Sequence, residues 1–131
     1  MKRDLYSNLS PAESLAPALL AASANGTGVD IRGFDSALVV FHIGNWTDGT
    51  HTFSIEESDD DSTYTAVNSA YLQGTAPTVT SDANDDQIYK VGYVGDKRYI
   101  RAVQTITGSP STGLVSGVTV LRGHPATAPV S

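Results

Sequence analysis

The amino-acid sequence predicts an all-β protein: a single antiparallel sandwich or jelly-roll-like barrel of about eight short strands with an extended N-terminal arm. Segments rich in Val, Ile, Thr and Tyr recur along the chain, and turn residues separate them about every 8 to 12 residues. Only 17% of the 131 residues are charged. That composition suits strands and turns better than long helices. The chain has no cysteine, which excludes disulfides and thiolate metal sites.

The first 27 residues differ from the rest, because they hold leucine and alanine without a sustained period. Ser10 to Glu13 has the pattern of a helix start, with serine as N-cap and glutamate at the capping-box position. Pro17 limits any such helix to a short one. We therefore expect residues 1–27 to form an arm with at most a short helix.

Two interpretations of this arm stay open. It is either held by a neighbouring subunit or lies as a strap across its own domain. Its larger apolar side chains are candidate interaction residues: Leu5, Tyr6, Leu15 and Leu19.

A β domain is expected over residues 28–122, after a turn at 25–28. The run 37–43 is continuously apolar, as in a strand that is covered on both faces. In 51–56, His51, Phe53 and Ile55 alternate with polar residues, which indicates a half-buried strand. Proline at the start of 77–80 fits an edge strand. The other expected strands are 29–31, 63–67 and 114–121; residues 68–74 fit either a turn or a short helical turn, and 123–131 form an extended C-terminal tail.

Residues 88–107 give the strongest local signal. Two β-rich runs flank residues 94–97, where Gly95-Asp96 can adopt the positive φ values of a two-residue hairpin turn. We therefore expect a β-hairpin here.

Charge is unevenly distributed within a net charge of −6. Residues 33–89 hold ten Asp and Glu and no Lys or Arg, whereas residues 90–122 hold five basic residues and one acid. The basic and acidic stretches are expected to meet, either within one fold or between neighbouring subunits. Lys97, Arg98 and Arg101 are the candidate residues for this contact.

No pattern of catalytic or metal-binding residues stands out. The acidic segments 56–62 and 81–86 lack the EF-hand spacing and fit solvated loops better than a calcium site. The histidines His42, His51 and His124 show no zinc-ligand spacing. Neither a nucleophile elbow nor a phosphate-binding glycine loop occurs. We therefore expect no enzyme activity, no cofactor and no metal.

Two further patterns have alternative interpretations. Tyrosines alternate with basic residues over 89–101, as in single-stranded nucleic-acid binding, but the negative net charge favours a packed strand pair and no nucleic acid. Trp46 precedes a turn and is a candidate interface anchor or sugar platform, unless the loop buries it. No apolar run is long enough for a membrane helix, which requires about 18 residues.

An ordered set of segments across nearly the whole chain resembles a family of small virion proteins of tailed bacteriophages, similar to capsid decoration (cement) proteins. No single motif is diagnostic, but the ordered set is. The segments are MKRDLYSN (1–8), LAPA (15–18), NGT (25–27), GFDSA (33–37), TDGTH (47–51), ESDDDST (57–63), KVGYVGDKRY (90–99) and GHP (123–125).

The resemblance implies a non-enzymatic protein on the outer capsid surface of the virion. Its expected partners are the major capsid protein and further copies of itself, in a trimer or a dimer. The alternatives are another virion component, such as a head–tail joining or tail protein, and a carbohydrate-binding module.

Overall fold

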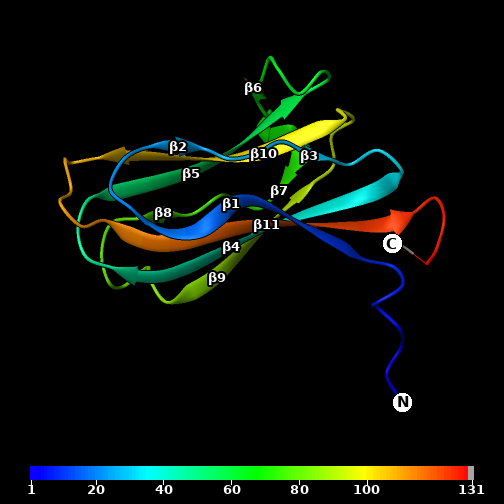
Figure 1. Ribbon diagram of the computed structural model, residues 1–131, viewed down its shortest axis with the longest axis horizontal. Helices are drawn as coiled ribbons and strands as arrows, with labels where there is room; N and C mark the ends of the chain where they lie inside the picture. The colour runs from blue at the N-terminus through cyan, green and yellow to red at the C-terminus, as the bar shows by residue number, and fades with distance from the viewer. Residues whose placement is uncertain (130–131) are drawn as a thin grey trace.

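The computed structural model describes residues 1–129, which form a sandwich of two antiparallel sheets (Figure 1). One sheet has the strand order β1-β11-β4-β9-β7. The six-stranded sheet has the order β2-β10-β5-β6, with β3 beside β10 and β8 beside β5. The predicted all-β sandwich is confirmed, and the sheets do not close into a barrel. The strands are β1 (Ser10–Leu20), β2 (Ala24–Asn25), β3 (Val29–Asp30), β4 (Phe34–Trp46), β5 (Thr50–Ser58), β6 (Thr65–Ala66), β7 (Leu72–Gln73), β8 (Thr78–Val79), β9 (Gln87–Tyr93), β10 (Tyr99–Thr107) and β11 (Leu114–Pro125).

The strand order is that of a jelly roll. When β2 is grouped with β3, and β6 with β8, the eight positions run 1-8-3-6 in one sheet and 2-7-4-5 in the other, with β7 as an added edge. This order contains the two Greek keys of the jelly roll. Successive long strands therefore lie in opposite sheets, and most connections cross from one layer to the other.

The core lies between the sheets and follows the two-residue period of the strands. On β4, Val39, Phe41 and Ile43 point inward, and on β5, Phe53 and Ile55 do so. The rings of Phe41 and Phe53 meet edge to face across the two sheets, with centroids 5.5 Å apart. The predicted alternation of β5 is confirmed.

A chain of polar side chains also crosses the core. The fully buried His51 contacts the carbonyl oxygen of Asp48 through Nε2 at 2.9 Å, and this contact requires the Nε2–H tautomer. Its Nδ1 then accepts from the amide of Gln104 at 3.1 Å, and Gln104 Oε1 accepts from Ser116 at 3.4 Å. This series of hydrogen bonds joins β5 and β10 of one sheet to β11 of the other, so each of these buried polar groups has a hydrogen-bond partner.

The predicted hairpin over residues 88–107 is wrong. β9 pairs with β4 and β7, whereas β10 pairs with β5, β2 and β3, so residues 94–98 cross between the sheets. Gly95 does not have a positive φ. It is small because the loop wraps the ring of Tyr93: a Cβ at position 95 would lie 2.5 Å from Tyr93 Oη. Position 95 therefore requires glycine because the backbone packs closely against Tyr93, and not because the chain makes a tight turn there.

The short helix expected at Ser10 is also wrong, since residues 10–20 form the edge strand β1 against β11. Arg122 fixes its beginning by donating to Ser10 O at 3.2 Å and Ser10 Oγ at 2.7 Å. These residues therefore belong to the sandwich, as the strap interpretation requires. Residues 1–9 precede the first strand, and in Figure 1 they trail away from the body near the C-terminal end of the described chain.

The remaining elements refine the expected ranges. Residues 69–71 form a short 3₁₀ turn capped by Asn68, and β8 is an edge strand as expected at 77–80. β11 runs to Pro125, so the first part of the expected tail is strand; Val130 and Ser131 lie outside the described residues. Within residues 1–129, no helix is long and apolar enough to cross a membrane.

Candidate functional site

The outer face of the five-stranded sheet carries most of the exposed apolar side chains on the strands. Its side chains form rows that the strand register defines. One row runs Pro11, Leu121, Leu38, Gly92 and Gln73 from β1 to β7. The next outward row, Glu13, Thr119, Val40 and Lys90, is polar at both edges. We call this whole surface the apolar face.

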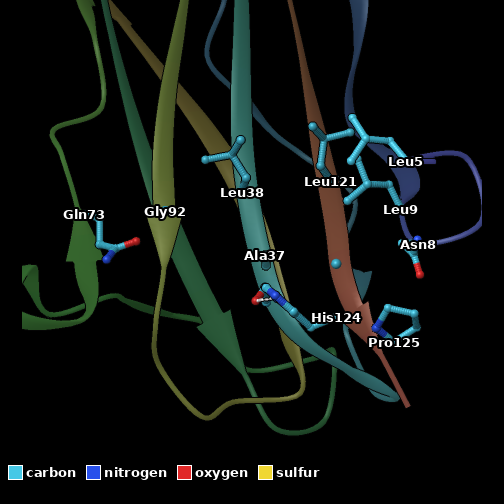
Figure 2. A pocket seen from close by; sticks show the side chains of 12 residues that line it. Leu5, Asn8, Leu9, Ala37, Leu38, Gln73, Gly92, Leu121, His124 and Pro125 are labelled. Carbon is cyan, nitrogen blue, oxygen red and sulfur yellow. Dashed lines mark hydrogen bonds between the residues drawn. The ribbon is translucent and has the colours of Figure 1, made fainter. Parts of the chain in front are cut away.

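The first row, from β11 to β7, forms the floor of a hollow of about 560 Å³ (Figure 2). Leu38 and Leu121 supply its apolar floor, and the N-terminal segment contributes Leu5 and Leu9 along one side. Gly92 has no side chain, and the side chain of Gln73 lies over its position, since a Cβ there would be 2.5 Å from Gln73 Oε1. Leu9 covers Gly123, since its Cδ2 lies 3.2 Å from where a Cβ of that residue would be. The hollow is concave and apolar, as recognition sites usually are.

A small polar pair lines the same hollow. Ser36 Oγ and His124 Nδ1 are hydrogen-bonded, as the dashed line in Figure 2 shows. His124 has a positive φ of 49°, which is unusual for a residue with a side chain. An activated nucleophile needs its base oriented by a third group. Among the described residues, no carboxylate hydrogen-bonds His124, and the pair instead offers hydrogen-bonding groups beside apolar walls.

The other end of the apolar face carries a second group of exposed apolar residues. Leu19 on β1 pairs with Val115 on β11, and they are 54% and 41% exposed. His42 on β4 pairs with Ile88 on β9, which is 64% exposed. A smaller hollow of about 220 Å³ lies between Pro17, His42 and Val115. We call Leu19, Val115, His42 and Ile88 the distal group.

The outer face of the six-stranded sheet is chemically different. Its rows pair Thr105 with Thr52 and Val103 with Ser54. Arg101 faces Glu56 across β10 and β5, donating through Nε at 2.9 Å and Nη2 at 2.6 Å to the same oxygen. The guanidinium also lies 4.0 Å above the ring of Tyr64. This polar face is therefore satisfied by its own side chains.

The three basic residues singled out in the sequence pair with acids of the same chain. Lys97 contacts Asp59 at 2.9 Å, and Arg101 contacts Glu56. Arg98 donates to both carboxylate oxygens of Asp30, from Nε at 3.0 Å and from Nη2 at 2.8 Å. Of the two contacts expected from the charge map, the structure shows the one within a single fold. These three basic side chains therefore already form ion pairs within a single chain.

The ion pairs shift the pKa values of their members. The hydrogen bond from Arg98 lowers the pKa of Asp30, against a smaller opposing effect of burial. Hydrogen bonding to Asp59 raises the pKa of Lys97. In both pairs the charged form is favoured, so the pairs persist at neutral pH.

Carboxylates of the two acidic loops accept hydrogen bonds from backbone N–H groups. Asp60 accepts hydrogen bonds from Ser58 Oγ and from the backbone N–H of Ser62 and Thr63, and these lower its pKa. In the second loop, the buried Asp85 accepts from the backbone N–H of Trp46 at 2.8 Å. No group of His, Cys, Asp and Glu within residues 1–129 has the arrangement of a metal site.

The remaining candidate residues divide between the core and the surface. Trp46 is half-buried and donates through Nε1 to Gly49 O at 2.9 Å, so the turn covers it and it is not an open platform. Leu15 is part of the core. Leu5, Tyr6 and Leu19 are exposed, with Leu5 at the hollow and Leu19 in the distal group.

Sequence reasoning missed the residues that define the apolar face. Leu38 and His42 lie in the apolar run 37–43, which predicted burial on both faces. Val115 and Leu121 looked like ordinary strand residues of 114–121. These residues become recognisable only when the strand register is known. Once β4 and β11 are paired, their outward-facing positions fall into apolar rows.

No protein-family model matches the chain, and no curated protein matches it.

Proposed function

We propose that this protein is a bacteriophage capsid decoration (cement) protein, which binds the outside of the assembled head and stabilises the lattice of the major capsid protein. The ordered set of segments described above supports the role. The observation that carries it in the structure is the difference between the two outer faces, because one is satisfied internally and the other leaves apolar surface in water.

In this proposal the distal group contacts the capsid. Leu19, Val115 and Ile88 are exposed on rigid strands rather than on loops, so little conformational entropy is lost when they dock. Exposed apolar residues grouped on one face mark interaction surfaces. The negative net charge keeps decorated particles apart in solution.

Stabilisation of the head follows from mass action. A protein that binds the assembled lattice but not free capsid subunits lowers the free energy of the assembled state by its binding free energy. No reaction is needed for this role. The protein acts as a homo-oligomer, a trimer or a dimer, on the capsid surface.

The test is to add the purified protein to expanded capsids that lack it and to measure co-sedimentation and the temperature of capsid disruption. Binding that saturates at a fixed ratio to the major capsid protein, together with a higher disruption temperature, supports the proposal. Absence of binding, together with absence of the protein from purified virions, contradicts it.

A second virion role, as a head–tail joining or tail protein, predicts a different copy number. Quantitative mass spectrometry of virions separates the two roles, because a decoration protein is present in proportion to the capsid lattice and a joining protein forms a single ring. The third candidate, a carbohydrate-binding module, is less favoured, because Trp46 is half-buried and its indole N–H is hydrogen-bonded to Gly49 O. A glycan array without signal would remove it.

A further inference from the structure

The N-terminal segment, residues 1–9, is folded on itself rather than fastened to the sandwich. Ser7 N–H donates to the Asp4 carboxylate at 3.2 Å, Asn8 Nδ2 to Asp4 O at 3.1 Å, and Asn8 N–H to Leu5 O at 3.0 Å. Within the described part of the chain, the hydrogen bonds of this segment stay inside it. Its connection to the sheet is apolar, through Leu5 and Leu9 at the hollow.

This turn holds Tyr6 away from its own domain. Tyr6 is 89% exposed, and the preceding Leu5, which lines the hollow, is 67% exposed. A tyrosine suits such a hollow because its ring is apolar and its hydroxyl needs a hydrogen-bond partner. Leu38 and Leu121 can contact the ring, while Ser36 and His124 can pair with the hydroxyl.

Charge favours a second copy of the chain as the source of that tyrosine. The segment carries Lys2 and Arg3, both exposed, on a chain whose net charge is −6. At the same end of the sandwich, Asp35 and Asp96 are exposed carboxylates that take part in none of the three ion pairs of residues 1–129, beside one exposed cation that also takes part in none, Arg32. Among the groups of this surface that are not ion-paired, carboxylates therefore outnumber cations. The basic segment of one copy and the acidic rim of another are therefore complementary.

We propose that two copies pair about a two-fold axis through this surface, with Tyr6 of each copy in the hollow of the other. Lys2 and Arg3 of each copy then lie near Asp35 and Asp96 of its partner. Protrusion and hollow belong to one patch, which is what an isologous interface requires. The inference rests on the homo-oligomer part of the proposed function and is independent of capsid binding.

Disulfide trapping tests the contact directly, because the natural chain has no cysteine. Arg3→Cys and Asp35→Cys proteins are prepared separately, one with a tag that gives the mixed dimer its own mobility, then mixed and oxidised mildly, and the products are separated on a non-reducing gel. Both proteins keep Tyr6 and the hollow, and we expect a mixed disulfide dimer from this pair. The control pair is Arg3→Cys with Thr105→Cys, which places the second thiol on the polar face. Equal dimer yields from the two pairs would overturn the proposal.

Sedimentation of the full chain gives the second measurement. The unmodified protein should form a dimer that weakens as salt increases. Tyr6→Ala should weaken the dimer roughly 30-fold or more, as loss of a central aromatic anchor does. Tyr71→Ala, which removes another exposed tyrosine, should leave it unchanged.

A chain that stays monomeric at all concentrations up to about 1 mM contradicts the proposal, as does a dimer that tolerates Tyr6→Ala. Capsid co-sedimentation of the Tyr6→Ala protein separates the two proposals. If that monomer still binds capsids, the decoration role stands without the proposed dimer contact.

Discussion

The two outer faces of the sandwich are built from strands of the same jelly roll, but their exposed side chains differ. One face pairs its charged side chains with one another, and the other exposes apolar side chains to water. On the six-stranded sheet, Arg101 is paired with Glu56 and stacked on Tyr64. On the five-stranded sheet, Val115 and Ile88 stand in water on rigid strands. The charged residues of β10 that stand out in the sequence are therefore paired within the fold, whereas the strands of the five-stranded sheet leave apolar side chains exposed.

The largest expected effect concerns the core that both faces share. Phe41 lies behind the apolar face and contacts Phe53 behind the polar face. Phe41→Ala should lower the free energy of unfolding by about 3–5 kcal/mol, because it removes a buried ring and leaves a cavity. Urea denaturation measures this. A loss below about 1 kcal/mol would show that the sheets do not depend on this contact for their cohesion.

The polar face should contribute less, through Arg101. Arg101→Ala removes the ion pair with Glu56 and the stacking on Tyr64, and should lower the free energy of unfolding by about 1–2 kcal/mol. A double-mutant cycle with Glu56→Ala separates the ion pair from the stacking. If Arg101→Ala is neutral while Glu56→Ala is not, the polar face is not stabilised in the way described.

The smallest expected effect is the pH dependence of stability. The hydrogen bond from Arg98 holds the folded pKa of Asp30 below the ordinary value of an aspartate, and backbone hydrogen bonds do the same for the pKa of Asp60. The unfolded chain therefore takes up protons first as pH falls, so their contribution is present above about pH 4 and is lost as pH falls through the folded pKa values.

The melting temperature should therefore fall below about pH 4, and Asp60→Asn should make that fall less steep. Asp82→Asn, in an exposed loop position, is the control. An equally steep fall in the Asp60→Asn protein would show that its hydrogen bonds to Ser58, Ser62 and Thr63 do not contribute to acid sensitivity.

The fold class was predictable because residue composition and two-residue alternation are local properties of strands. The connections were not, because they depend on which sheet each strand joins. Gly95-Asp96 is a sound hairpin signal between paired strands, but Tyr93 and Tyr99 pair with strands of different sheets. Similarly, Ser10 to Glu13 carries helix-start residues, yet pairing with β11 outweighs that local preference.

The candidate site was predictable only in part, for the same reason. Leu5, Tyr6 and Leu19 were selected as apolar residues of an arm and are exposed on or beside the apolar face. Leu15 has the same chemistry but points into the core. The buried link between His51 and Gln104 likewise joins residues 53 positions apart, and only the strand register brings them together.

In the proposed function the apolar face, and not the polar face, binds the capsid. Co-sedimentation of matched variants with expanded capsids distinguishes the two faces. Val115→Asp and Thr105→Asp each place one carboxylate at an exposed strand position, on opposite faces. Both should fold with a change in stability within about 0.5 kcal/mol. We predict that Val115→Asp abolishes capsid binding while Thr105→Asp binds like the unmodified protein; normal binding by Val115→Asp together with loss of binding by Thr105→Asp would contradict the claim.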